Sequence, residues 1–314
     1  MGGVELMKRT VFAVIVLLSM SCSVAGQVLP FFTDTALTVG FESNALRTFS
    51  RVVVRNQLRS EGQEVPDPSD QDVFVFAQVF AVPVRINSDT VFTAVTRVLH
   101  KQLNFTAPGS SREQLSDTGL GDTTLLVKRR FYVDNFQGGG IQLALLGGVK
   151  LPTGDDNQRD NQGNLLPPGL QLGTGSVDVP VGLVFTAFKD RIGFNSSFLY
   201  QFNNESNGFR FGDETKVNLA FGYRLFPKQY TSFQDKLLNA YLEVNTVVSQ
   251  RASLNDQSVP DSGGTTVFLT PGIQAVLHPR FLVEAAFQIP VVQELNGTQL
   301  SFSPTANVGI RVLF

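Results

Sequence analysis

Residues 216–225, KVNLAFGYRL, alternate strictly between two kinds of side chain. The odd-numbered positions are all large and apolar or aromatic, whereas the even-numbered positions carry lysine, asparagine, alanine, glycine and arginine. Successive side chains of a β-strand point to opposite faces of the sheet, so this period of two predicts a strand with one wholly apolar face. Residues 191–203 and 238–249 repeat the pattern. The chain is therefore expected to be all-β.

The same alternation divides most of the chain into about twelve strands. We expect them near residues 46–60, 72–86, 90–105, 121–135, 140–152, 174–188, 191–203, 209–226, 236–252, 264–277, 280–294 and 299–314. Short turns alternate with longer polar connections, among them the loops expected at 107–120 and 153–173. Two connections break this rule. Residues 226–235 form a long connection at the end where short turns are expected, and residues 296–297 form a short connection at the end where long loops are expected.

Alternating short and long connections are typical of outer-membrane barrels, which have tight periplasmic turns and longer outer loops. A bilayer offers no hydrogen-bond partner to an open sheet edge, so a spanning sheet must close. A soluble β-sandwich is the alternative, but its strands are usually only about five or six residues long. We therefore predict a transmembrane antiparallel up-and-down β-barrel of about 12 strands over residues 46–314, of the Gram-negative outer-membrane type.

The first 25 residues have the features of an export signal that is cleaved after Ala25. Lys8 and Arg9 form a basic start, residues 11–20 are apolar except for one serine, and small side chains precede the cleavage point. Ten residues are too few to cross a bilayer as a helix. Residues 26–45 fit no strand. They are expected to be either a periplasmic leader or a segment inserted into the barrel.

The last nine residues, 306–314, place alanine, valine, isoleucine, valine and phenylalanine on one face. With Gly309, Val312 and the terminal Phe314, this ending resembles the C-terminal assembly signal of Gram-negative outer-membrane proteins. The resemblance implies that the barrel assembly machinery recognises the last strand. It also implies outer-membrane lipid as the surroundings of the barrel.

The composition excludes several classes of site. The 314 residues include 25 basic and 27 acidic side chains, and this net charge of −2 provides no basic field for nucleic acid. One cysteine and two histidines leave no cysteine-rich metal site and little basis for catalysis. His278 lies in an expected turn, and His100 is expected to be a polar side chain facing the lumen. We expect no cofactor and no enzymatic activity.

Two motifs carry a family resemblance. Residues 148–155, GVKLPTGD, and residues 172–178, LGTGSVD, resemble the signatures of a family of outer-membrane channels named for the meta-pathway of phenol degradation. The resemblance implies a barrel that passes small, often aromatic or hydrophobic, compounds. Independently of the family, Pro152 lacks an N–H and should end a strand, and the acidic run that follows does not have calcium-loop spacing.

Charged residues on the polar faces of the strands are the candidate functional site. If the apolar faces meet lipid, the inward set comprises Arg51, Arg55, Lys128, Arg130, Lys150, Lys216, Arg224, Arg311, Glu243, Glu284, Asp134 and Asp178. These groups either pair across neighbouring strands and fill a narrow interior, or form an electropositive constriction that favours organic anions. The set is more basic than acidic.

Three functions follow from these patterns. The leading one is a passive outer-membrane channel for small-molecule solutes, which are aromatic or hydrophobic compounds or organic anions. The second is a structural or adhesive barrel whose lumen is plugged by its own side chains, without transport. The third, a barrel enzyme acting on lipid, would have to use His100 or His278.

Overall fold

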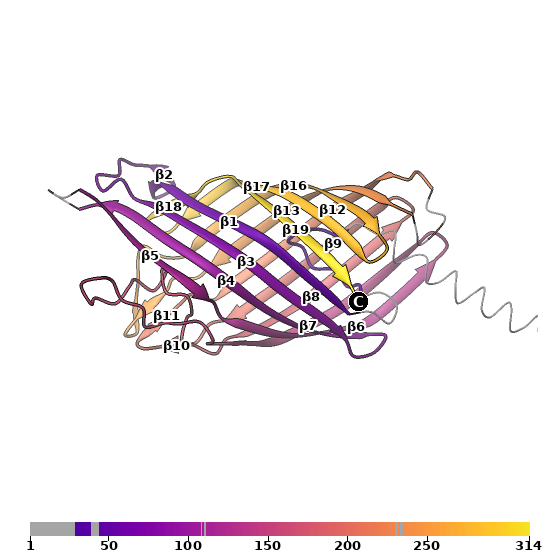
Figure 1. Ribbon diagram of the computed structural model, residues 1–314, viewed down its shortest axis with the longest axis horizontal. Coiled ribbons are helices and arrows are strands. Elements are labelled where there is room, and N and C mark those ends of the chain that lie inside the picture. The colour runs from indigo at the N-terminus through magenta and orange to yellow at the C-terminus, as the bar shows by residue number, and fades with distance from the viewer. Residues whose placement is uncertain (1–28, 39–43, 108, 110, 230–231, 233–234) are drawn as a thin grey trace, which may run out of the picture.

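The computed structural model describes residues 29–38, 44–107, 109, 111–229, 232 and 235–314. The expected export signal, residues 1–25, lies outside the described residues. Within them, no helix has both the length and the apolar character needed to cross a membrane. The described chain is built of β-strands that run obliquely around a common axis (Figure 1).

One large antiparallel sheet contains fifteen of the strands. They are β1 Ala45–Ser60, β2 Gln63–Glu64, β3 Asp72–Arg85, β4 Thr90–Thr106, β5 Arg112–Leu120, β6 Thr123–Phe136, β7 Gly139–Leu151, β8 Val179–Lys189, β9 Ile192–Phe202, β12 Glu214–Phe226, β13 Leu237–Ser249, β16 Gly264–His278, β17 Phe281–Leu295, β18 Thr298–Phe302 and β19 Thr305–Leu313. A small sheet in the connections contains β10 Glu205–Ser206, β11 Phe209–Arg210, β14 Ser253–Leu254 and β15 Gln257–Ser258.

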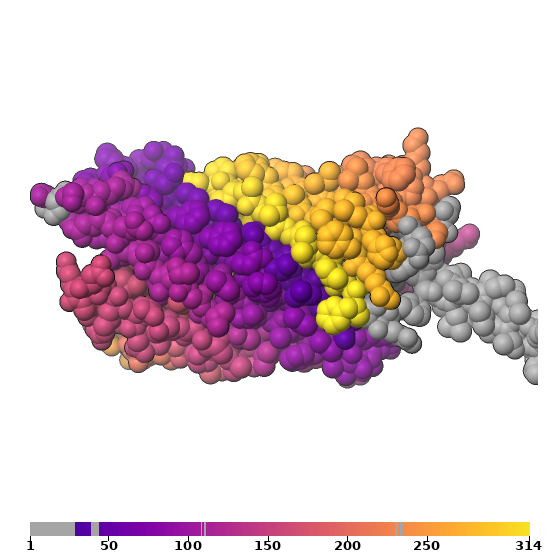
Figure 2. All heavy atoms as spheres, viewed as in Figure 1, coloured from indigo at the N-terminus to yellow at the C-terminus, as the bar shows by residue number. Residues whose placement is uncertain are grey.

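Strand β1 closes the wall, because it pairs with β3 along one edge and with β18 and β19 along the other. Figure 2 shows this seam from outside, where the indigo and violet surface near the N-terminus lies against the yellow C-terminal end. Two strands of the wall are broken: β5 and β6 both pair with β4, and β18 and β19 both pair with β1. With each broken strand counted once and the hairpin strand β2 left out, the wall has twelve strands. The predicted barrel is confirmed.

The connections differ between the two ends of the barrel. At one end, which we call the short-turn end, β3 joins β4, β6 joins β7, β8 joins β9 and β16 joins β17 within a few residues. At the other, the long-loop end, residues 152–178 and 203–213 make extended connections (Figure 1). The C-terminal residue Phe314 lies at the short-turn end, where its backbone N–H donates to Asn44 O. This is the arrangement expected of an outer-membrane barrel.

The loop predicted at residues 107–120 is wrong, because β5 occupies most of this segment. Its sequence, REQLSDTGL, has no continuous apolar face, so the period of two does not reveal it. Pairing with β4 supplies the order instead. The ladder runs from the pair Val98 and Leu120 to the pair Thr106 and Arg112.

Several strand boundaries also differ from the prediction. β8 begins at Val179 because the preceding residues form a turn, in which Gly175 has a φ of +69° that strongly favours glycine. β12 begins at Glu214, after the small sheet strand β11. Pro304 has no N–H to donate, and the last strand of the wall is broken there between β18 and β19.

The two faces of the wall have the expected chemistry on most strands. On β12, the alternate residues Leu219 and Phe221 are 41% and 59% exposed, whereas Ala220 between them is 1% exposed. On β13, Asn239 and Glu243 are fully buried. The apolar faces therefore point outward and the polar faces line the lumen, as a barrel in lipid requires.

Strand β4 reverses this rule in its second half. Leu99 is 6% exposed and packs inside the barrel against Ala77 and Leu172. His100 consequently lies on the outer face, where its Nδ1 atom is 2.7 Å from the hydroxyl of Thr118 on β5. The prediction that His100 faces the lumen is wrong, because β4 carries apolar residues on both faces and the pattern does not distinguish them.

Candidate functional site

Residues 29–38, which we call the plug segment, lie inside the barrel. The carboxylate of Glu243 accepts hydrogen bonds from the backbone N–H groups of Phe31, Phe32 and Thr33, at 2.7 Å for the first and last of them. It also accepts one from the Thr33 hydroxyl at 2.6 Å. Phe31 packs against the inward residue Tyr241. A fully buried carboxylate is stabilised by such charge-assisted bonds. The plug segment therefore stabilises the buried charge of Glu243, and the same bonds attach the segment to the wall.

Four further strands hold the plug segment. Side chains of Arg47 on β1, Lys128 on β6, Thr186 on β8 and Gln274 on β16 all bond to it. Lys128 Nζ lies 2.9 Å from the Asp34 carboxylate, and an Arg47 terminal nitrogen donates to Phe31 O at 2.7 Å. The plug segment is thus tied to strands on several sides of the wall, near the short-turn end.

Most of the sequence-predicted lumen charges have partners. Arg130 lies 2.9 Å from Asp89, Lys216 lies 2.7 Å from Glu214, Arg311 lies 4.0 Å from Glu284, and Arg224 donates from Nε to Pro227 O at 3.2 Å. Glu284 also accepts from Arg47 Nε at 2.7 Å, with its own side chain fully buried. These residues form a paired network at the inner surface of the wall.

Asp134 is an exception, because it does not face the lumen. The pairing of β6 with β7 shifts by one residue between Arg130 and Tyr132. Such a bulge exchanges the two faces of a strand, since the side-chain period is two. Asp134 is exposed and pairs with Ile141, on the face opposite the buried residues Gln142 and Ala144. The prediction of an inward Asp134 is therefore wrong.

The two family-like motifs meet at one buried ion pair. Lys150 Nζ contacts the carboxylates of both Asp178 and Asp122, the second at 3.2 Å, and also the Thr174 hydroxyl. Asp122 accepts from Gly154 N at 3.1 Å and from Thr174 N at 3.0 Å. These contacts fasten both ends of the 152–178 connection to the break between β5 and β6.

The glycines of the motifs permit this close packing. A Cβ atom at Gly173 would lie 2.3 Å from the carbonyl oxygen of Gly154, a distance that real Cβ atoms do not reach. The motifs therefore have a structural explanation in this barrel.

A second group of charges lacks such partners. We call it the arginine cluster: Arg51 and Arg55 on β1 and Arg97 on β4. Among the described residues, none of the three guanidinium groups forms an ion pair or a hydrogen bond, and the Nε atoms of Arg51 and Arg97 are buried without an acceptor. The carboxylate of Glu214 on β12 acts electrostatically on all three, and it is already bonded to Lys216.

An apolar surface lies between these arginines. Arg51 pairs in register with Ala77 on β3, and Arg97 pairs with Val79. Ala77 packs with Leu99 and with Leu172, a residue of the 152–178 connection, and Val79 joins them. We call these four residues the apolar patch: Ala77, Val79, Leu99 and Leu172.

Sequence reasoning missed five residues of the lumen. They are Arg47, Arg97, Lys101, Asp122 and Glu214. Glu214 could have been predicted by extending the alternation of β12 from Lys216 two residues toward the start of the strand. For Arg97 no signal was available, because the residues around it on β4 are apolar on both faces.

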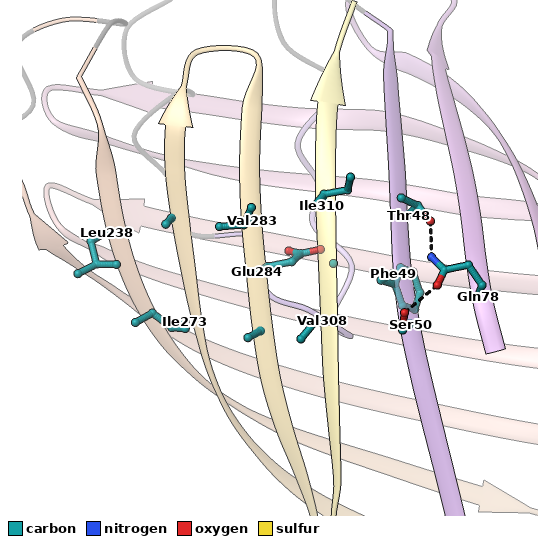
Figure 3. A pocket seen from close by; sticks show the side chains of 13 residues that line it. Thr48, Phe49, Ser50, Gln78, Leu238, Ile273, Val283, Glu284, Val308 and Ile310 are labelled. Atoms are coloured by element: carbon teal, nitrogen blue, oxygen red, sulfur yellow. Dashed lines mark hydrogen bonds between the residues drawn. The ribbon is translucent and has the colours of Figure 1, made fainter. Parts of the chain in front are cut away.

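The outer wall also contains a shallow groove, shown in Figure 3, with a volume of about 540 Å³. Leu238, Ile273 and Val283 line part of it, and three polar side chains lie at one end. There Ser50 donates to the Gln78 side-chain oxygen at 2.7 Å, and Gln78 Nε2 donates to the Thr48 hydroxyl at 2.6 Å. These three polar side chains are thus hydrogen-bonded to one another.

Among the described residues, no cluster of three or more histidine, cysteine, aspartate or glutamate side chains could hold a metal ion. The main features of the described interior are the plug segment, the paired network and the arginine cluster.

Two solved structures of outer-membrane proteins align with this chain. The COG4313 outer membrane channel from Pseudomonas putida F1 aligns with a TM-score of 0.67 and 14% identity, over 92% of this chain and 100% of that chain. The beta domain of the Bordetella autotransporter Brka aligns with a TM-score of 0.43 and 12% identity, over 87% of this chain and 99% of that chain. No curated protein matches the sequence. The first of these likenesses establishes the fold.

A family comparison covers residues 68–302, which include both motifs and all strands from β3 to β18. This is well over half of the chain, and it confirms the resemblance found in the motifs. The chain therefore belongs to the family described as "Putative MetA-pathway of phenol degradation", and its fold is that of an outer-membrane β-barrel.

Proposed function

We propose that this barrel is a passive channel for small solutes in the outer membrane, and that the solutes are aromatic or hydrophobic compounds or organic anions. The observation that carries the proposal is the arginine cluster, which borders the apolar patch inside a closed wall. A lumen that served only to fill the barrel would pair its charges, because a buried charge without a partner is costly. Unpartnered guanidinium groups beside apolar side chains suit a solute with both kinds of surface.

The plug segment narrows the interior and favours the second candidate, a structural or adhesive barrel without transport. Its attachment argues against a permanent seal. Glu243 and the other ties hold it by hydrogen bonds and ion pairs, which exchange with water and solute, and no covalent bond among the described residues joins it to the wall. In the proposed channel, the plug segment limits the size of the solute and shifts when a solute passes.

We propose that residues 1–25 direct secretion, that the short-turn end is periplasmic, and that the barrel assembly machinery recognises β19. Gly309 on this strand faces inward, where a Cβ atom would lie 2.8 Å from Phe49 Cβ, and Phe314 is 60% exposed at the short-turn end. The exposed ring is accessible to a protein partner in the periplasm.

Liposome swelling tests the proposal. The purified barrel, reconstituted into liposomes, should admit small neutral solutes, and its conductance in planar bilayers should favour anions over cations because the unpartnered lumen charges are basic. Cation selectivity would remove organic anions from the solute class. A barrel that passes neither ions nor neutral solutes, while it migrates as a folded species in gels, would establish the plugged structural barrel instead.

A further inference from the structure

The arginine cluster is a buried group of like charges, and the two acids that act on it, Glu214 and Asp122, are bonded to lysines. The carboxylate of Glu214, which acts on all three arginines, lies 2.7 Å from Lys216 Nζ. Asp122, whose charge also acts on Arg97, is bonded to Lys150. Glu214 therefore has a lysine partner, Asp122 shares Lys150 with Asp178, and none of the three guanidinium groups forms an ion pair within the described residues.

The arginines are held in place by aromatic and apolar contacts that leave their donors available. The guanidinium carbon of Arg55 lies 3.9 Å from the Phe302 ring centroid, and that of Arg51 lies 5.6 Å from the Phe32 ring centroid. Cation–π contacts use the face of the guanidinium plane and leave the N–H groups at its edge free. A Cβ atom at Gly121 would lie 2.8 Å from Arg97 Cγ, so this glycine makes room for the arginine side chain.

The apolar patch lies between the two arginines that have unsatisfied Nε atoms. Arg51 is in register with Ala77 and Arg97 with Val79, two inward residues of β3 that follow one another on the same face. Ala77 and Leu99 are 8% and 6% exposed and pack with Leu172 of the 152–178 connection. An occupant of this place would meet guanidinium donors on both sides and aliphatic side chains beneath it.

From this juxtaposition we propose that the arginine cluster and the apolar patch form a binding site for an organic monocarboxylate with an apolar body. The carboxylate accepts paired hydrogen bonds from Arg51 and Arg97, a geometry that the guanidinium fork favours. The body of the molecule packs on Ala77, Leu99 and Leu172. An inorganic anion would satisfy the charges but would make no apolar contact with the patch. The inference rests on the proposed solute channel and names a substrate class for it.

Binding measurements on the purified full-length barrel in lipid nanodiscs test the site directly. Benzoate provides a carboxylate and an apolar ring, benzamide provides the ring without charge, and acetate provides the charge without the ring. We expect benzoate to bind at least about tenfold more tightly than either, since each charge-assisted bond and the buried ring contribute. Equal binding of benzoate and benzamide would overturn the proposal. Binding of acetate as tight as that of benzoate would contradict the role of the patch.

Matched variants assign the binding to these residues. Arg51→Gln and Arg97→Gln should each lower the affinity for benzoate by about tenfold or more. Arg159→Gln removes the same charge from an exposed position of the 152–178 connection and should leave it unchanged. Glu214→Gln should tighten benzoate binding, because it removes the opposing charge. Folding of each variant is checked by its heat-modifiable migration in gels. Wild-type affinity in both folded arginine variants would sink the assignment.

The site and the channel can fail separately. If neutral solutes swell liposomes but benzoate does not bind, the monocarboxylate site is wrong and the channel stands. If benzoate binds with the expected variant pattern but no solute crosses, the site stands and the passive channel is wrong.

Discussion

The lumen has two regions that differ in whether their charged side chains form ion pairs. Toward the short-turn end, the buried carboxylates of Glu243 and Glu284 meet the plug segment and Arg47, so that acids and bases are paired. Farther along the same strand, Arg51 has no ion-pair partner among the described residues. Arg47 and Arg51 are only four residues apart on β1 and share its inward face. Their difference teaches that the residues on nearby strands and on the plug segment, not the arginine or its own strand, decide whether a lumen charge has a partner.

If pairing gives a charge a structural role, the largest effect should come from Lys150, which joins Asp122 and Asp178 with 8% of its side chain exposed. Lys150→Met should lower the free energy of unfolding by about 3–5 kcal/mol, because it leaves two buried carboxylates without their cation. Urea unfolding in lipid vesicles measures this loss. Lys189→Met, at an exposed position, is the control and should change little. Equal stability of the two variants would contradict the structural role of the pair.

The second effect concerns the hydrogen bonds by which Glu243 holds the plug segment. Glu243→Gln replaces one acceptor oxygen by a donor and removes the charge, which should weaken the attachment by about 2 kcal/mol. A change of this size raises the displaced population on the order of thirtyfold, and single-channel recordings should show higher or more frequent conductance. Glu294→Gln alters an exposed carboxylate of β17 and serves as the control. Unchanged recordings would mean that the plug segment does not limit conductance.

The third prediction is a buried substitution that raises the free energy of unfolding, whereas most buried substitutions lower it. Arg51→Gln removes a guanidinium charge without an ion-pair partner and should raise the free energy of unfolding by about 1 kcal/mol. Arg47→Gln, four residues earlier, removes a paired guanidinium and should lower it. The two variants, unfolded in urea side by side, measure the comparison itself. A loss of stability in both would show that Arg51 has a structural partner after all.

The smallest effect is expected at the rim of the long-loop end. Arg112 contacts Asp70 and Asp72 there, but 44% of the Arg112 side chain and 78% of the Asp70 side chain are exposed. Water and salt screen such pairs, so Asp70→Asn should change the free energy of unfolding by less than about 0.5 kcal/mol. A larger loss in urea unfolding would indicate that exposed rim pairs contribute as the buried ones do.

The barrel was predictable because its strands are long and have one face for lipid and one for the lumen. Where a strand lacks that contrast, prediction failed: β5 is polar on both faces, and part of β4 is apolar on both. The inward positions of Glu243 and Lys216 follow from alternation alone, whereas Asp134 was misplaced by a single bulge. Pairing inside the lumen depends on which strands lie close together in the wall, such as β1 and β17 on either side of β19. No local pattern reveals that Arg47 meets Glu284 while Arg51 meets no carboxylate at bonding distance.

The plug segment also has a mechanical consequence. Its bonds reach β1, β6, β8, β13 and β16, which are spaced around the circumference of the ring. A hollow cylinder of hydrogen-bonded ribbons flattens easily, because bending a sheet between neighbouring ribbons strains no bond along them. Hydrogen bonds and an ion pair that join several strands to one internal segment resist such flattening. The roundness of this end of the cylinder is thus maintained from within.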